Sequence, residues 1–184
     1  MNRLQSKRFL YRNILKQAFC FGIAFILLIG EVSFFGQGTK VVGKSMENTF
    51  MEGDSLFIDK LSYHFVEPKR FDIVVFPFKD KGELLFYIKR IIGLPGEKVT
   101  ILDGKVYINN SEVPLKEPYL KEKWIVKTGP YEFEVPEGCY FCMGDNRNAS
   151  ADAREWNNPY VAKEKIIGKA LWIYFPFDHW GEVK

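Results

Sequence analysis

The chain has 184 residues, of which 47% are hydrophobic and 27% are charged, so it can fold as one domain and wholesale disorder is excluded. The net charge of +3 is too small to indicate a nucleic-acid partner, and no nucleic acid is expected. An aromatic content of 16%, with 17 Phe, and the β-branched residues that dominate after residue 40 disfavour a helical bundle.

The first segment of the chain is basic and then strongly apolar. Residues 1–17 carry five bases and no acid, whereas the other 167 residues carry 21 bases and 23 acids. The run from Ala18 to Phe35 contains one charge, Glu31, and its 18 residues span about 27 Å as a helix, close to the ~30 Å apolar core of a bilayer. Because basic flanks stay in the cytoplasm, we expect a cytoplasmic basic arm (1–16), a transmembrane helix (17–36) and an extracytoplasmic domain (37–184).

The apolar segment has two other interpretations, a cleaved secretory signal and a buried helix of a soluble protein. A cleaved signal needs small residues at positions −3 and −1 of a site after the apolar run. The positions available here are Glu31-Val32-Ser33 and Phe34-Phe35-Gly36, and neither fits that pattern. The sequence therefore favours an uncleaved, single-pass anchor in the cell membrane.

After residue 38, short apolar runs alternate with turn residues, which is typical of β proteins. Two of these runs, 99–102 and 105–108, are joined by Asp103-Gly104 and predict a hairpin. Residues 113–130 are rich in Pro, Lys and Glu and predict an excursion, so we expect a small β-ribbon insertion over about 100–130. Further strands are predicted over 71–76 (ending before Pro77), 84–92, 132–135, 140–143 and 170–175. The predicted fold class is mainly β, an antiparallel domain preceded by one transmembrane helix.

Lys89 lies within the predicted strand 84–92, where side chains alternate between two faces. Its neighbours on the same face are Tyr87 and Ile91. Loss of hydration there would lower the pKa of the amine, so that a neutral Lys89 can act as a general base. The alternative is a surface lysine whose stem covers the strand and whose ammonium stays in water.

A histidine-based catalytic triad fits the sequence poorly. The two histidines, His64 and His179, lie in a polar stretch and in the C-terminal tail, and Gly-x-Ser-x-Gly is absent because position 47 is Glu. If a serine is the nucleophile, a lysine is the available base. Cys139 and Cys142 alone do not make a zinc site, and no metal is expected.

Several motifs occur in a specific order. After the basic arm and the span come Gly-x-Ser-Met-x-x-Thr (43–49), Gly-Asp (53–54), Lys-Arg-Ile-Ile-Gly-Leu-Pro-Gly (89–96) and Gly-Asp-Asn-Arg-x-x-Ser-x-Asp-x-Arg (144–154). In this combination the chain resembles bacterial type I signal peptidases (leader peptidases) of the short Gram-positive form, from about residue 8 to about residue 177. The resemblance implies a signal-peptidase-like antiparallel β catalytic domain with a small β-ribbon insertion.

The resemblance also implies roles for individual residues. Ser45 matches the nucleophile and Lys89 the general base, while Ser150 matches a serine that orients the lysine amine. The supporting ion pairs would be Asp152 with Arg154 and Asp145 with Arg90. The positions that match substrate-pocket residues are Val41, Met46, Phe50, Tyr87 and Ile88.

Three positions concern the oxyanion site and departures from the family pattern. The Ser45 backbone N–H matches one oxyanion donor, but Gly43 replaces a hydroxyl residue of some Gram-negative relatives, which leaves the second donor open. Asn48 replaces the usual proline, so the loop after Ser45 loses a fixed φ. Ala153 replaces a common serine.

The expected function is that of a membrane-anchored serine endopeptidase with a Ser/Lys dyad. It would remove signal peptides from exported preproteins and cut after small residues at −1 and −3, as a monomer without cofactor. Its partners would be preprotein signal peptides and the lipid bilayer. The alternatives are a family member that is dedicated to a narrow set such as pilin precursors, a non-cleaving assembly factor, and a self-cleaving regulator, which the span in place of a DNA-binding domain disfavours.

Overall fold

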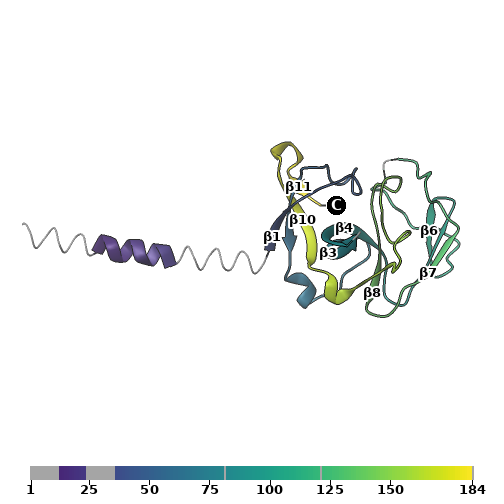
Figure 1. Cartoon of the computed structure of the whole chain (residues 1–184), viewed down its shortest axis with the longest axis horizontal. Coiled ribbons are helices and arrows are strands. Elements are labelled where there is room, and N and C mark those ends of the chain that lie inside the picture. The colour runs from purple at the N-terminus through teal and green to yellow at the C-terminus, as the bar shows by residue number, and fades with distance from the viewer. Residues whose placement is uncertain (1–12, 24–35, 81, 121, 184) are drawn as a thin grey trace, which may run out of the picture.

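The computed structural model describes residues 13–23, 36–80, 82–120 and 122–183. Residues 13–23 form a helix (Figure 1). Within the described ranges, no helix has both the length and the apolar character needed to cross a membrane. The predicted basic arm (1–16) and transmembrane helix (17–36) fall largely on residues 1–12 and 24–35, which lie outside the described residues, so both stay predictions.

The larger of two sheets has eight strands, all paired antiparallel, in the order β1-β2-β10-β3-β4-β8-β9, with β11 paired to β10. Three short 3-10 helices, η1 (Ser62–His64), η2 (Lys163–Lys165) and η3 (Phe177–His179), lie between strands. The strands are β1 (Gly36–Lys40), β2 (Ser55–Asp59), β3 (Ile73–Asp80), β4 (Glu83–Gly93), β8 (Cys139–Met143), β9 (Tyr160–Ala162), β10 (Gly168–Phe175) and β11 (Gly181–Glu182).

The smaller sheet has three antiparallel strands in the order β6-β5-β7 and lies at the opposite side of the domain from β1 and β2 (Figure 1). Its strands are β5 (Lys98–Leu102), β6 (Lys105–Ile108) and β7 (Tyr131–Glu134). The predicted hairpin is confirmed, with Leu102 paired to Lys105 around the Asp103-Gly104 turn. β5 and β6 precede the excursion predicted over 113–130, and β7 follows it.

The mainly β antiparallel fold is confirmed, but β1, β2, β9 and β11 were not among the predicted strands, and β3 ends later than predicted. β3 continues past Pro77 to Asp80, because β3 pairs with β10 only at Val74 and Val75, so the missing Pro77 N–H faces no strand on that side. β1 was not predicted because its sequence, GQGTK, is typical of a turn. It forms by pairing with β2, and the absence of a side chain at Gly36 makes room for the Phe57 ring.

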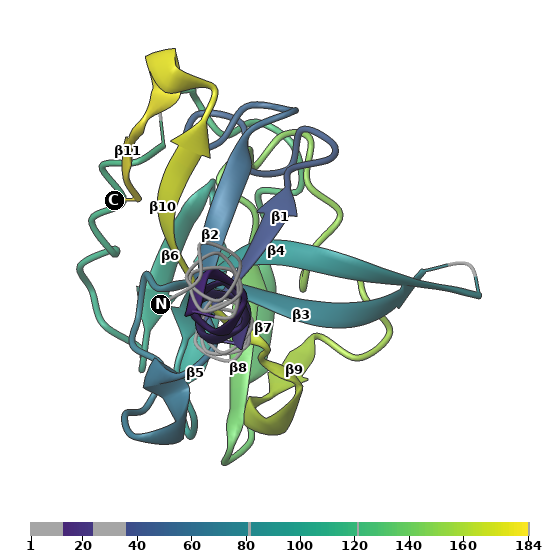
Figure 2. The same ribbon diagram turned by 90° about the vertical axis from the view of Figure 1, so that its left-hand side faces the viewer.

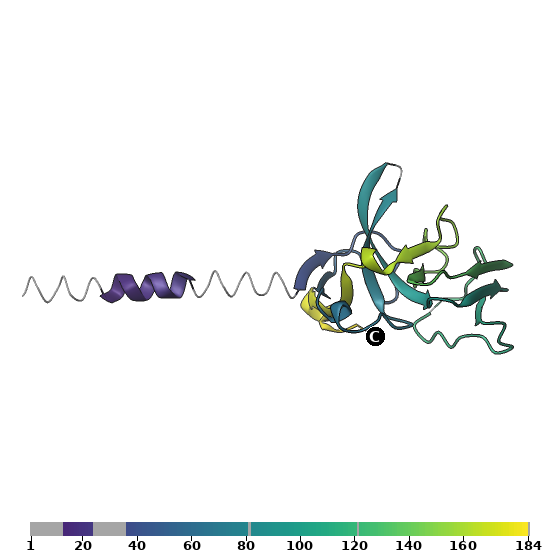
Figure 3. The ribbon, with the colours of Figure 1, turned by 90° about the horizontal axis from the view of Figure 1, so that it is seen from below.

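The outer halves of β3 and β4 form a two-stranded arm that projects from the body of the domain (Figures 2 and 3). β4 pairs with β3 from Glu83 to Arg90, but it pairs with β8 only from Arg90 onward. Among the described residues, the other edge of β4 therefore has no strand partner before Arg90. Lys89 lies where the arm joins the body.

Candidate active site

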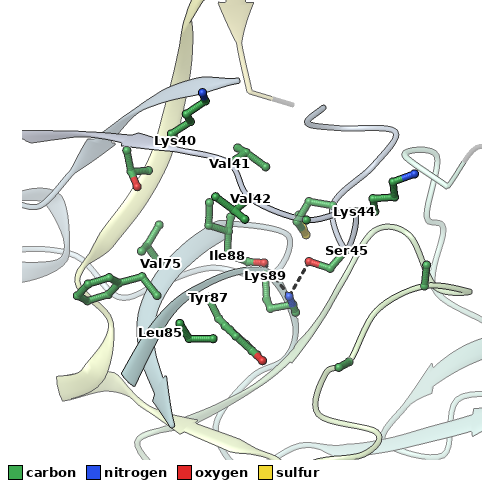
Figure 4. Close-up of a pocket in the computed structure, with 16 residues that line it drawn as sticks. Lys40, Val41, Val42, Lys44, Ser45, Val75, Leu85, Tyr87, Ile88 and Lys89 are labelled. Carbon is green, nitrogen blue, oxygen red and sulfur yellow. Dashed lines mark hydrogen bonds between the residues drawn. The ribbon is translucent and has the colours of Figure 1, made fainter. Parts of the chain in front are cut away.

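Ser45 lies in a tight turn after β1 that is fixed to the core on one side. The N–H groups of Thr49 and Phe50 both donate to the Met46 carbonyl, and the side chains of Met46 and Phe50 are buried in a hydrophobic cluster with Leu56. The Ser45 carbonyl also accepts a hydrogen bond of 3.0 Å from the Asn146 N–H. These contacts hold the turn, while the Ser45 residue stays partly exposed. Figure 4 shows the Ser45 side chain pointing toward Lys89.

Lys89 reaches Ser45 from the base of the β3–β4 arm, where the arm joins the body of the domain. Its Nζ lies 2.8 Å from Ser45 Oγ and donates a hydrogen bond of 3.1 Å to the Ile88 carbonyl. The ammonium nitrogen also lies 4.8 Å from the centre of the Tyr87 ring, in keeping with their predicted common face. Lys89 is only 3% exposed, which excludes the alternative of a surface lysine with its amine in water.

Burial lowers the pKa of Lys89 to about 8 because the charged form loses its hydration. The negative charges of Asp152 and Asp145 act in the opposite direction, since they favour the ammonium. Burial is the larger effect, so a substantial fraction of Lys89 is a neutral amine at mildly alkaline pH. A neutral amine at hydrogen-bond distance from a serine hydroxyl can accept its proton.

The ion pair of Arg90 and Asp145 joins β4 to the loop after β8. Arg90 Nε and one terminal nitrogen bind the two carboxylate oxygens at 2.8 and 2.7 Å, and both side chains are almost fully buried. The Thr49 hydroxyl donates to the same carboxylate and lies 3.4 Å from an Arg90 nitrogen. Sequence reasoning did not assign a role to Thr49, although the last position of the Gly-x-Ser-Met-x-x-Thr motif was a signal.

A second buried pair, Asp152 with Arg154, lies beside this site. Arg154 binds both Asp152 oxygens at 2.8 Å, and Asp152 also accepts a 3.0 Å hydrogen bond from the Gly144 N–H. Burial by itself raises the pKa of Asp152, but the hydrogen bonds and charge of Arg154, with smaller contributions from Gly144 and Ser150, hold the pKa below its usual value. Asp152 is therefore an anion near Lys89 throughout the neutral range.

Ser150 is buried, and its hydroxyl lies against Gly144, where an added Cβ would collide with it. The resemblance implies that this serine orients the Lys89 amine. Within the described part of the chain, the Ser150 hydroxyl makes no hydrogen bond of ordinary geometry, to Lys89 or to any other group. Its orienting role stays a prediction.

A groove with a cavity volume of about 530 Å³ runs past Ser45 and Lys89. Four of the predicted pocket residues, Val41, Met46, Tyr87 and Ile88, line it, whereas Phe50 is fully buried in the core and does not. Alternation along β4 was a usable signal for Leu85, which shares a face with Tyr87. The lining residues that sequence reasoning missed are Thr39, Lys40, Val42, Gly43, Lys44, Val75, Leu85, Phe86, Ala149 and Ala151.

No group of three or more His, Cys, Asp or Glu side chains in the described ranges is arranged to hold a metal ion. The site that the structure assembles is instead a hydroxyl, an amine and two buried ion pairs beside an apolar groove. That arrangement suits acyl transfer by a serine nucleophile with a lysine base.

Comparison with known proteins finds that the chain is similar to signal peptidases. The family model described as "Signal peptidase, peptidase S26" matches residues 14–175. A signal peptidase I of Leptolyngbya laminosa is 36% identical, over 88% of this chain and 80% of that protein. A signal peptidase I of Bacillus licheniformis is 37% identical, over 85% and 86%. The crystal structure of a signal peptidase I from Enterococcus faecalis V583 is 34% identical and covers 56% of this chain and 97% of that chain, with a TM-score of 0.45.

We predict that Asp145→Asn lowers the free energy of unfolding by about 3–5 kcal/mol, because it removes the carboxylate that balances a buried Arg90 charge. Denaturant unfolding of the full chain in detergent, followed by tryptophan fluorescence, measures the change. The control is Glu67→Gln, which breaks an exposed pair with Lys163 and should leave the free energy of unfolding nearly unchanged. Equal costs for the two variants would contradict this account.

A second prediction concerns Asn48, whose φ of 91° lies in the left-handed region that proline cannot enter. We expect Asn48→Pro to destabilise the protein by at least about 1 kcal/mol, because the turn after Ser45 must change its backbone. Asn48→Gly should stay within about 0.5 kcal/mol of the original chain, since glycine adopts this φ freely. The same unfolding assay decides, and a proline variant as stable as the original chain would refute the prediction.

Proposed function

The chain belongs to the signal peptidase family, peptidase S26, and is a serine peptidase, and we propose that it removes signal peptides with Ser45 as nucleophile and Lys89 as general base. The observation that carries this assignment is the 2.8 Å distance between Ser45 Oγ and the amine of a buried lysine. No metal or cofactor takes part in the proposed steps.

In the acylation step, Ser45 Oγ attacks the carbonyl carbon of the scissile bond while neutral Lys89 accepts the hydroxyl proton. The tetrahedral intermediate then collapses as the C–N bond breaks, and the Lys89 ammonium returns that proton to the departing amine. The mature protein leaves with a free amino terminus, and the signal peptide remains as an ester on Ser45. Water then attacks the ester with Lys89 as base, which releases the signal peptide acid and restores the serine.

The oxyanion of each intermediate needs hydrogen-bond donors that point at it. We assign one donor to the Ser45 backbone N–H, which donates to no other group within the described residues. The Gly43 N–H donates to Glu52 Oε1 at 3.3 Å, a long bond on an exposed side chain. The second donor is left unassigned.

The buried ion pair of Arg90 and Asp145 positions the dyad in this proposal. Arg90 follows Lys89 on β4, and its pair with Asp145 ties that strand to the loop of residues 144–154. Thr49 ties the Ser45 turn to the same Asp145 carboxylate. The nucleophile and the base are thus held by a common anion, so their separation does not depend on the long Lys89 side chain alone.

The substrate is proposed to bind the groove in an extended conformation, since one edge of β4 before Arg90 has no strand partner among the described residues. The apolar lining by Val41, Tyr87 and Ile88 next to the dyad supports cleavage after small residues at −1 and −3, because a shallow apolar site excludes large side chains. Met46 contributes to the same lining.

We further propose that the chain is anchored in the cell membrane, with its N-terminus in the cytoplasm and its β domain outside. The described part of the N-terminal helix supports this, because its apolar side chains are exposed, Phe19 by 70% and Phe21 by 75%. A complete dyad within one chain supports action as a monomer on preproteins at the lipid bilayer. The alternative of a dedicated or non-cleaving assembly factor is not favoured by the matched relatives, whose names are those of signal peptidases.

The assignment predicts that the full-length protein in detergent cleaves a preprotein with an Ala-x-Ala site, and that Ser45→Ala and Lys89→Ala each lower kcat/KM at least about 1,000-fold. Mass spectrometry of the product locates the cut. Ser111→Ala and Lys105→Ala, which make the same changes on exposed positions of the smaller-sheet region, are matched controls and should retain activity. A folded original chain that leaves the site uncut would overturn the proposal.

The lowered pKa of Lys89 predicts the direction of the pH dependence. Because the neutral amine is the active form, kcat/KM should rise with pH through about 8, by about tenfold per unit well below that value, and then level off. Lys89→Arg stays charged and should be inactive across the same range. An activity that is flat between pH 6.5 and 9, or that falls as the pH rises, would exclude Lys89 as the base.

A further inference from the structure

We propose that Lys44 makes this enzyme select substrates by the charge of the residues that directly follow the scissile bond, favouring acidic side chains over basic ones. The inference rests on the proposed function of Ser45 and the groove. It concerns the part of the substrate that becomes the mature N-terminus.

Lys44 directly precedes the nucleophile and lines the groove with it. Consecutive Cα atoms are about 3.8 Å apart, so an extended lysine side chain reaches substrate atoms on either side of the attacked carbonyl. Figure 4 shows the Lys44 side chain on the side of Ser45 that faces away from Leu85, Tyr87 and Ile88. Its ammonium therefore lies beyond the apolar end of the groove.

The two sides of Ser45 differ in chemistry, and this difference gives the groove a direction. Next to Ser45, the side lined by Val41, Leu85 and Ile88 is apolar and suits the small apolar residues that precede a signal-peptide cleavage site, while Lys40 lies farther out on that side. Since the substrate chain passes Ser45 once, the residues after the scissile bond leave on the other side. Lys44 is the charged side chain that lines the groove there.

The charge of Lys44 is not matched by a contacting carboxylate. Among the described residues it takes part in no ion pair, and it is exposed. The two nearest acids in the sequence have other partners: Glu47 accepts a 3.2 Å hydrogen bond from the Asn146 amide, and Glu52 accepts the Gly43 N–H. A substrate carboxylate placed here gains an attractive interaction, whereas a substrate ammonium is repelled.

The size of the effect follows from Coulomb's law in a partly hydrated site. At a separation of about 8 Å and an effective dielectric constant of about 40, one unit charge changes kcat/KM by roughly fivefold. Replacing an acidic residue by a basic one reverses the sign, so the ratio between the two substrates should approach about 25-fold. The ratio should fall toward one in 1 M salt, where the Debye length is about 3 Å.

The experiment compares three preprotein substrates that are identical except for Asp, Asn or Lys at the first position after an Ala-x-Ala site. The full-length protein in detergent is expected to prefer Asp over Asn and Asn over Lys. Lys44→Gln should bring the Asp-to-Lys ratio to within about threefold of one, Lys44→Glu should invert it, and Lys44→Arg should keep it. Lys40→Gln is the matched control, because it removes the other exposed lysine that lines the groove, at its far end from Lys44 (Figure 4), and should leave the ratio unchanged.

The outcomes separate this inference from the proposed function. If the original chain cleaves all three substrates at equal rates, or if Lys44→Gln retains the full ratio, the charge selection is wrong while the peptidase assignment stands. If Lys40→Gln abolishes the ratio instead, the direction assigned to the groove is wrong. If none of the substrates is cut by the folded original chain, the proposed function itself fails.

Discussion

The properties of the candidate active site depend on the burial of the Lys89 amine. Lys89 is almost inaccessible to water, and it points at a serine hydroxyl from a strand whose outer half leaves the body of the domain. A buried ammonium loses hydration that its surroundings must replace, and here the Ile88 carbonyl, the Tyr87 ring and more distant carboxylates do so only in part. Because this replacement is incomplete, the pKa of Lys89 falls to about 8. At that pKa the amine is still basic enough to take a proton, and a substantial fraction of it is neutral.

The carboxylates near Lys89 are arranged so that they do not cancel the effect of burial on its pKa. A fully buried anion next to Lys89 as a direct partner would fix it as an ammonium. The nearby carboxylates of Asp145 and Asp152 instead bind their own arginines, Arg90 and Arg154. They act on the lysine only at a distance, so the ion pairs stiffen the site without cancelling the effect of burial. The same loop, residues 144–154, also supplies the Asn146 N–H that holds the Ser45 carbonyl.

The elements that could be predicted were those with a local signal. The hairpin at Asp103-Gly104 and the strand that carries Lys89 followed from turn chemistry and from apolar runs, and they are present in the structure. β1 and the extension of β3 through Pro77 had no such signal. β1 forms by pairing with β2, and the extension of β3 forms by pairing with β4. Phe50 shows the same limit within the site: a motif placed it near the nucleophile, and packing put it in the core.

The residues on which the proposed chemistry depends can be found in the sequence alone: a serine, a lysine with apolar neighbours, two histidines that do not suit a triad, and a family order of motifs. Those are properties of residue type and spacing, which need no fold to be recognised. Tertiary packing buries Lys89, brings its amine to Ser45 across 44 positions of chain, and lets Thr49 and Arg90 share the Asp145 carboxylate. Burial and long-range contact arise when separate segments pack, and no local pattern encodes the environment that sets a pKa.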